Sequence, residues 1–295
     1  MPGNMPRPTM KRNSRQRLEY IETMAFYTAV VTRSDLVRAF GLSDPAATKI
    51  LKQYNELTPG NLVYRQAVFG FVPGTSFQPV FADLSPAVAL PLIASNLAAA
   101  AMPFAEQSIY GIPTDRLPIP QRFPQAAVLA QITRAIKQRK KIEIRYHSLS
   151  GRDKLEPRII EPHALVDNGL RWHMRAYNPR DFDFRDFVLS RVLGANMLDE
   201  PAESSAEYDE AWMDMIPLQL APHPGLDARQ QRILELDYGM TDGIVTLDLR
   251  RAMVGYVLQQ LAVDSSADHS LNPSAYPLIV LNRAEIEPFA GWAFL

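Results

Sequence analysis

The hydrophobic residues at the start of the chain repeat with the spacing of a helix. A first helix is predicted over 14–28, with one apolar face made by Leu18, Ile21 and Ala25. A short helix is predicted over 35–40, with Thr32 or Ser34 as its N-cap. It ends at Gly41, because glycine suits the left-handed position that closes many helices.

A third helix is predicted over 44–57, and it would bury Ala47, Ile50, Leu51 and Tyr54. A short helix, a tight turn and a longer helix are typical of a helix-turn-helix. The apolar segments 62–65 and 67–72 are predicted to pair as a hairpin, the wing of a winged helix. Small, amide and cationic side chains can reach base edges and phosphates, and the candidate DNA-binding residues are Arg33, Ser43, Thr48, Lys49, Lys52, Gln53 and Arg65. The alternative is a three-helix scaffold with no role in nucleic-acid binding.

Proline and alanine dominate the next part of the chain, over 76–124. A connecting helix is predicted from 86 to about 101, and an extended linker follows it. A further helix over 125–138 has an apolar face made by Val128, Leu129, Ile132 and Ile136. It leads directly into a segment with a different periodicity.

From Lys140 onwards, polar and apolar residues alternate with a period of two, which indicates strands. Strands are predicted over 141–148, 155–162, 164–166, 169–177 and 182–189. Short strands in this number and spacing are typical of a small, strongly bent antiparallel barrel.

The strand over 169–177 has two unlike faces. Trp172, Met174 and Ala176 form an apolar face that is expected to anchor the barrel core. The other face carries two permanent cations and one titratable ring, and its residues are Arg171, His173, Arg175 and Tyr177. A strand that is buried on both faces in a hydrophobic core does not carry two arginines and a histidine on one face. We therefore interpret this face as part of a surface that holds an anion.

The last third of the chain follows an acidic spacer over 199–214. Alternation predicts strands over 231–238, 243–249 and 276–281, and the spacing of apolar residues predicts an amphipathic helix over 250–261. The pattern indicates a compact α+β module.

Charge divides the chain into regions of opposite sign. The net charge of the whole chain is −1, yet residues 1–75 carry +5, residues 134–195 carry +6 and residues 196–295 carry −11. Basic regions suit phosphates, whereas an acidic third is typical of a solvated face or an interaction module, and chance segregation is the alternative. The chain has no cysteine and no apolar run of 18 residues, so we expect no disulfide, no thiolate metal site and no membrane span. A cytoplasmic location is expected.

Arginine and aromatic residues from neighbouring strands of the predicted barrel could converge beside the strand over 169–177. Arginine recognises phosphate through paired hydrogen bonds, and aromatic rings can stack on bases. The candidate effector-binding residues are Tyr146, Ser148, Arg158, His163, Arg171, His173, Arg175, Arg185 and Arg191. The alternative is structural, with Arg158 and Arg191 pairing with carboxylates such as Glu161, Asp181 or Asp186 to order the barrel.

Metal and enzyme chemistry find little support in the sequence. His147, His163 and His173 lie on separate strands and lack the spacing of helical zinc ligands. No nucleophile elbow, phosphate-binding loop or dinucleotide fingerprint is present. We therefore predict no metal, no cofactor and no enzymatic activity.

The span from about Ile142 to Leu198 resembles a WYL domain. Its naming tripeptide corresponds to Trp172-His173-Met174, so the aromatic first position is kept and the other two differ. The surrounding segments are more specific: Tyr146-His147-Ser148, Pro157-Arg158-Ile159, Glu161-Pro162-His163-Ala164-Leu165-Val166, Arg171 to Tyr177 and Arg185 to Arg191. They resemble the phage-defence-associated regulators of the CapW and BrxR type, and the resemblance extends over nearly the whole chain.

The resemblance implies an α+β protein with an N-terminal winged helix-turn-helix, a central Sm-like, SH3-type β-barrel and a C-terminal α+β dimerisation module. The expected boundaries are 1–78 for a basic arm and the DNA-binding domain, 79–124 for the connecting helix and linker, 125–200 for the WYL domain and 201–295 for the dimerisation domain. The implied protein is a homodimeric transcriptional regulator, with repression as the favoured mode, whose WYL domain senses an anionic or nucleic-acid-derived effector. A two-fold dimer predicts a pseudo-palindromic operator in double-stranded DNA.

Two other functions stay open at this point. One is a constitutive nucleic-acid-binding or scaffolding protein without an effector, in which the arginine face would bind nucleic acid directly. The other is an enzyme that acts on nucleic acid.

One residue departs from the family pattern at the candidate effector site. The replacement of the family's usual tyrosine by His173 removes one aromatic surface on which a base could stack.

Overall fold

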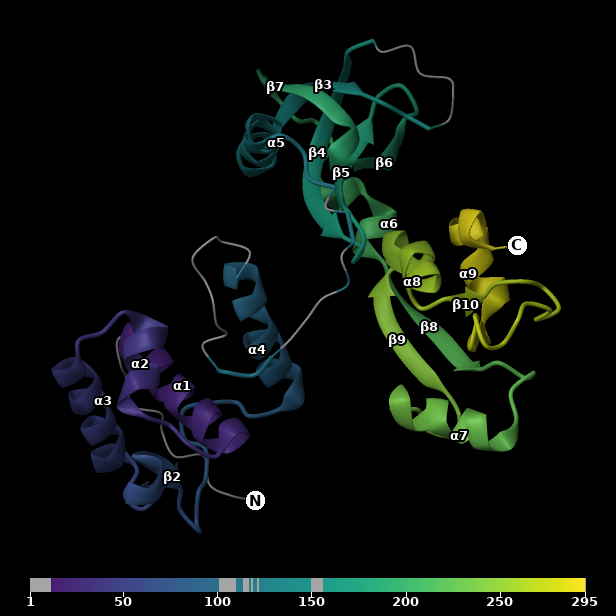
Figure 1. Cartoon of the computed structure of the whole chain (residues 1–295). Helices are drawn as coiled ribbons and strands as arrows, with labels where there is room; N and C mark the ends of the chain where they lie inside the picture. Colours follow the sequence, from purple (N-terminus) through teal and green to yellow (C-terminus); the bar gives the residue numbers. More distant parts are fainter. Residues whose placement is uncertain are drawn as a thin grey trace. The chain divides into compact units, whose positions relative to one another are not determined.

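The computed structural model describes residues 12–113 apart from 101–109, the positions 117, 119 and 120, and residues 122–149 and 156–294, with the backbone alone for 94–100. The chain forms two compact units, Met1–Pro118 and Ile119–Leu295 (Figure 1). We call them the N-terminal unit and the C-terminal unit. The start of the predicted basic arm and most of the predicted linker lie outside the described residues.

The N-terminal unit begins with three helices: α1 (Arg12–Thr28), α2 (Arg33–Phe40) and α3 (Asp44–Leu57). The α2 helix begins two residues before the predicted start, because Thr32, one of the two predicted N-caps, forms a reciprocal capping box with Asp35. It ends at Gly41, whose φ of 61° confirms the predicted left-handed position. The predicted apolar faces of α1 and α3 are confirmed as core, since Leu18, Ile21, Ala25, Ala47, Ile50, Leu51 and Tyr54 are all buried in one cluster.

The wing follows the third helix. The strands β1 (Leu62–Arg65) and β2 (Gly70–Pro73) pair in an antiparallel hairpin, with Leu62 opposite Pro73 and Arg65 opposite Gly70. The second strand was expected from 67, but a single 3-10 turn, η1 (Gln66–Val68), occupies its start. The helix α4 (Pro86–Ala100) contains Pro91, as the sequence predicted.

The C-terminal unit opens with α5 (Ala126–Gln138), which packs against a five-stranded antiparallel sheet. The strands are β3 (Lys140–Tyr146), β4 (Arg158–Asp167), β5 (Trp172–Asn178), β6 (Asp183–Val188) and β7 (Val192–Pro201), in the order β6-β5-β4-β3-β7. The predicted strands 155–162 and 164–166 are one strand with a bulge between Pro162 and Ala164. Because β6 and β7 are the edges of this sheet, strand pairing in the described residues does not confirm the barrel closure.

One strand face differs from the expectation. Met174 and Ala176 are fully buried, but Trp172 is 37% exposed and is no core anchor, because it begins β5 next to the hairpin turn. The opposite face is also buried, with His173 at 1% and Arg175 at 7% exposure. Both faces of β5 are therefore covered, and residues from beyond the sheet cover the polar one.

Those residues belong to the C-terminal module, which we define as residues 201–295. After the short turns η3 (Ala206–Tyr208) and α6 (Glu210–Met213), a second sheet has the order β10-β11-β8-β9. Its strands are β8 (Met215–Pro222), β9 (Val245–Arg250), β10 (Val263–Asp264) and β11 (Leu278–Val280). The helices are α7 (Ala228–Asp237), α8 (Val254–Gln260) and α9 (Arg283–Ala290), and 3-10 turns η4 (Arg251–Met253) and η5 (Gly291–Ala293) precede α8 and follow α9.

The strand predicted over 231–238 is wrong, because this segment lies in α7. The alternation there did not reflect a half-buried strand: α7 buries none of its residues, and Leu236 is 82% exposed. A capping box between Asp227 and Gln230 starts the helix instead. No strand was predicted from the sequence where β8 lies.

Candidate nucleic-acid interface and effector cavity

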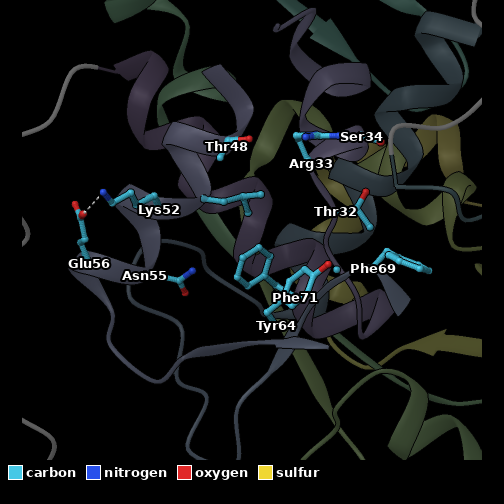
Figure 2. A pocket seen from close by; sticks show the side chains of 12 residues that line it. Thr32, Arg33, Ser34, Thr48, Lys52, Asn55, Glu56, Tyr64, Phe69 and Phe71 are labelled. Atoms are coloured by element: carbon cyan, nitrogen blue, oxygen red, sulfur yellow. Dashed lines mark ion pairs between the residues drawn. The ribbon is translucent and has the colours of Figure 1, made fainter. Parts of the chain in front are cut away.

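A groove of about 720 Å³ lies between the helix-turn-helix and the wing, and we call it the wing groove (Figure 2). One side comes from the start of α2 and from one face of α3, and the other comes from the hairpin. Its lining residues are Thr32, Arg33, Ser34, Thr48, Leu51, Lys52, Asn55, Glu56, Tyr64, Phe69, Gly70 and Phe71.

The seven candidate DNA-binding residues are all exposed. Arg33, Thr48 and Lys52 line the wing groove, whereas Ser43, Lys49, Gln53 and Arg65 lie outside it. The sequence interpretation missed Asn55, Tyr64 and Phe69. Helical spacing could have found Asn55, because it follows Thr48 by seven residues and therefore lies on the same face of α3.

The cations of this surface make only loose ion pairs. Arg33 lies 3.4 Å from Asp44, and Lys52 lies 3.9 Å from Glu56, with all four side chains more than half exposed. Exposed ion pairs of this kind stabilise a fold by about 1 kcal/mol or less. Breaking them to bind a phosphate therefore costs little free energy. The side-chain oxygen of Asn55 is buried and has no hydrogen-bond partner in the described part of the chain.

A buried network holds α3 against α1 and fixes the chain that leaves the wing. The Tyr54 hydroxyl donates to the Glu22 carboxylate, which also accepts from the backbone N–H groups of Val80, Phe81 and Ala82. Burial, followed by the charge of Glu22, raises the pKa of Tyr54 to about 12. The exposed face of α3 is therefore presented by a fixed helix.

A second hollow, of about 330 Å³, lies where the five-stranded sheet meets the C-terminal module, and we call it the junction cavity. Seven of the nine candidate effector-binding residues line it: Tyr146, Ser148, Arg158, Arg171, His173, Arg185 and Arg191. The cavity also includes Asp181, Asp186 and Tyr256. Alternation along the strands predicted these residues together, but it also predicted Arg175, which lies outside the cavity, and nothing local in the sequence placed Tyr256 of α8 beside them.

Arg175 and His163 are the two candidates that do not line the junction cavity, and both contact Asp209. Arg175 donates from Nε and Nη2 to the two Asp209 oxygens at 2.7 and 2.8 Å, and its Nη1 lies 3.3 Å from Asp186. The Nε2 atom of His163 lies 3.0 Å from Asp209. Burial alone would raise the pKa of Asp209, but the hydrogen bonds from His163 and Arg175 lower it to about 2. Neither side chain lines this cavity, and the assignment of both as effector ligands stays a prediction.

His173 forms the floor between the sheet and α8. Its ring lies 4.9 Å from the ring of Tyr256, and its Nε2 atom accepts from Arg171 Nε at 3.2 Å. Burial, opposed by the charge of Asp186, lowers the pKa of His173 to about 4, so the ring is neutral near pH 7. A neutral ring that accepts at Nε2 carries its proton on Nδ1, and this buried atom has no partner among the described residues.

Asp186 connects the cavity to the C-terminal module. It accepts from the Tyr256 hydroxyl at 3.0 Å and also contacts Arg175. Burial, with the charge of Asp186, raises the pKa of Tyr256, which stays a hydroxyl donor. Arg185, in contrast, is 55% exposed and pairs with Asp181 and Asp183 at 3.6 and 3.3 Å, as expected for a solvated strand end.

Outside these two sites, His223 is buried rather than at the surface, and it lies 3.1 Å from Asp264. Within the described ranges no group of three or more His, Cys, Asp or Glu side chains is arranged to hold a metal ion. None of the helices described here combines the length and the apolar character that crossing a membrane requires.

Sequence models of three domain families match the chain in order. Residues 13–94 match the winged helix-turn-helix domain of the BrxR transcriptional regulator, residues 127–197 match the WYL domain, and residues 215–286 match the C-terminal dimerization domain of the BrxR regulator. The fold and these matches define the class: a transcriptional regulator with a winged helix, a WYL domain and a dimerisation domain. The fold class predicted from the sequence is confirmed at this level.

Three curated relatives narrow the class further, and each is described as the DNA-binding transcriptional repressor CapW. The protein of Escherichia coli (strain KTE188) is 33% identical over 271 residues, covering 92% of this chain and 90% of that protein. The Stenotrophomonas maltophilia protein is 33% identical, with 92% and 90% covered, and the Pseudomonas aeruginosa protein is 32% identical, with 97% and 95% covered. The chain belongs to the CapW family. This is a family of repressors and not of enzymes, as the sequence predicted.

Proposed function

We propose that this protein is a homodimeric repressor that binds operator DNA through its winged helix and is released by an anionic, nucleic-acid-derived effector in the junction cavity. The relatives are DNA-binding repressors, and the C-terminal match is to a dimerization domain. The operator is pseudo-palindromic because a two-fold dimer presents two equivalent helices. The regulated genes include a phage-defence operon, which the resemblance to CapW and BrxR regulators supports.

The convergence of the predicted effector residues in the junction cavity is the observation that carries the effector proposal. Four arginines line a space of about 330 Å³ with only two carboxylates beside them, which suits a ligand with phosphate groups. The rings of Tyr146 and Tyr256 also line the cavity and offer apolar faces. A nucleotide or a short single strand presents the matching groups.

The position of Tyr256 explains how occupancy would reach the dimer. Tyr256 belongs to the C-terminal module, while the arginines belong to the sheet, so an effector between them changes how the two pack. A ligand regulates only when it prefers one arrangement over another. The repressor therefore responds to effectors that bind both the arginines and the α8 side of the cavity.

Fluorescence anisotropy of a labelled operator duplex tests the proposal. The wild-type complex should dissociate on addition of short single-stranded DNA or nucleoside monophosphates, with inorganic phosphate as the reference anion. Arg191→Ala should keep the affinity for operator DNA and lose the response, whereas Arg134→Ala, an exposed cation on α5, should keep both. An unchanged response in Arg191→Ala would reject the cavity as the effector site. A lower basal affinity for DNA in the same variant would favour the constitutive nucleic-acid-binding protein instead.

A further inference from the structure

The wing differs from the rest of the candidate DNA interface because it is apolar. Between Leu62 and Pro73 the only charged residue is Arg65. Four large apolar side chains of this short hairpin are exposed: Val63 at 42%, Tyr64 at 51%, Val68 at 42% and Phe69 at 72%. Such a concentration of exposed apolar surface marks a contact surface, since single scattered apolar residues are the usual case.

Phe69 stands at the tip in a conformation that the neighbouring chain imposes. Its φ is 47°, in the left-handed region that non-glycine residues avoid. On its C-terminal side, Phe71 exchanges two backbone hydrogen bonds of 2.9 Å with Val31. A Cβ atom on Gly70 would lie 2.9 Å from the Val30 side chain, so the hairpin is pressed against the segment before α2. The turn is therefore fixed, and it holds the Phe69 ring outward.

The two sides of the wing groove have different chemistry (Figure 2). The α3 side is mostly polar or charged, with Thr48, Lys52, Asn55 and Glu56 beside Leu51, and the wing side presents the rings of Tyr64, Phe69 and Phe71. A DNA strand has the same division, because its phosphates are charged while its sugars and base faces are apolar. The buried, unpartnered oxygen of Asn55 adds an acceptor that a base amino group could satisfy.

We propose that Phe69 is an apolar DNA contact, which packs against sugar and base surface at the edge of the minor groove and bends the duplex where it enters. Apolar wedges of this kind partly unstack a base step and kink the duplex towards its major groove, away from the wedge. Duplex DNA is the occupant because the wing continues the surface of α3 on the domain that matches a winged helix-turn-helix. This inference rests on the proposed DNA-binding function and adds a contact that determines specificity through DNA deformability.

The test compares four full-length variants on a 20-base-pair duplex that the wild-type protein selects from a random pool. Anisotropy is measured from 50 to 300 mM NaCl, and bending is measured by energy transfer between dyes at the duplex ends. Phe69→Ala should weaken binding by about tenfold or more and reduce the bend, with the salt slope unchanged, because no phosphate contact is lost. Phe69→Leu should keep most of the affinity. Lys52→Ala should instead lower the slope by about 0.9, as expected for one lost phosphate contact.

Phe69→Gly guards against a folding artefact. Glycine accepts a positive φ, so this variant keeps the turn while removing the ring. Its affinity should fall as far as that of Phe69→Ala. Unchanged affinity and bend in both variants would overturn the inference and leave the proposed function standing. A shift from dimer to monomer in sedimentation would overturn it in favour of a wing that packs on a second copy of the chain. A wild-type protein that selects no duplex would overturn the proposed function and the inference together.

Discussion

The two basic regions of this protein have similar charge in the sequence and different structures. In the wing groove the cations are exposed, and their carboxylate partners are loose: the Lys52 side chain is 78% exposed and lies 3.9 Å from Glu56. At the sheet, the side chain of Arg175 is 8% exposed and makes paired hydrogen bonds to Asp209, whose side chain is 1% exposed. The first arrangement leaves cations available to a long polyanion, whereas the second uses a cation to join two modules.

The difference shows that net charge locates a basic region but does not say what its cations do. An exposed cation can exchange its counterions for phosphates along a duplex, which makes binding depend on salt. A buried cation needs a fixed partner, because an unpaired charge in the interior is costly. The C-terminal unit holds both kinds: Arg175 is buried and paired with Asp209, whereas Arg185, in the lining of the junction cavity, is exposed.

The largest expected effect comes from breaking the buried pair. Asp209→Ala leaves Arg175 and His163 buried without their shared partner, and the free energy of unfolding of the C-terminal unit should fall by about 3–5 kcal/mol. Urea unfolding followed by tryptophan fluorescence measures this, because Trp212 donates its backbone N–H to Asp209. The control is Asp183→Ala, which removes a partner from an exposed pair. Equal, small losses in both variants would show that the buried pair does not join the modules.

The second effect is a pH dependence confined to the C-terminal unit. Unfolded His173 binds a proton below about pH 6.5, while the folded ring does so only near pH 4. The unfolded state therefore holds more protons in this window, and stability falls as pH decreases through it, by about 3 kcal/mol in total.

Thermal unfolding between pH 7 and pH 4.5 checks this expectation. His173→Asn should remove most of the dependence, and the N-terminal unit, which contains no histidine, provides an internal reference. If stability depended on pH with the same slope in the wild-type protein and in His173→Asn, burial would not be what holds His173 neutral.

These two sites also show what the sequence could and could not predict. The helix-turn-helix was predictable because its signals are local: a cap at Thr32, a glycine at 41 and one apolar face on each helix. Alternation likewise predicted several lining residues of the junction cavity, but it included Arg175, which lies outside the cavity. The role of Arg175 was not predictable, because Asp209 lies 34 residues further along the chain and no local pattern links them.

The strand predicted over 231–238 was wrong for a related reason. Alternation indicates a strand only when one face is buried, and α7 buries none of its residues. Its apolar residues Ile233 and Leu236 are exposed at 47% and 82%, so a period derived from core packing was assigned to residues outside any core of this chain. The capping box at Asp227 was the local signal that could have corrected the prediction.

A third prediction sharpens the contrast in salt dependence. Lys49→Ala and Lys52→Ala should each reduce the dependence of log affinity on log salt by about one unit, since each removes one phosphate contact. Arg171→Ala, in the junction cavity, should leave this slope unchanged. Titrations of operator DNA at several salt concentrations measure the slopes. A reduced slope for Arg171→Ala would mean that the two basic regions bind one continuous duplex.

The smallest expected effect is the loss of stability in Arg185→Ala. It distinguishes a structural role of Arg185 at the strand end from a role in effector binding. As a structural residue it pairs with Asp181 and Asp183, but the pairs are exposed, so Arg185→Ala should cost less than about 1 kcal/mol of stability. As an effector ligand it lines the junction cavity, so the same variant should weaken effector-induced release of operator DNA. Chemical unfolding and the release assay on one preparation separate the two roles. A full response with a small stability loss would assign Arg185 to the strand end and reduce the phosphate-binding set to Arg158, Arg171 and Arg191.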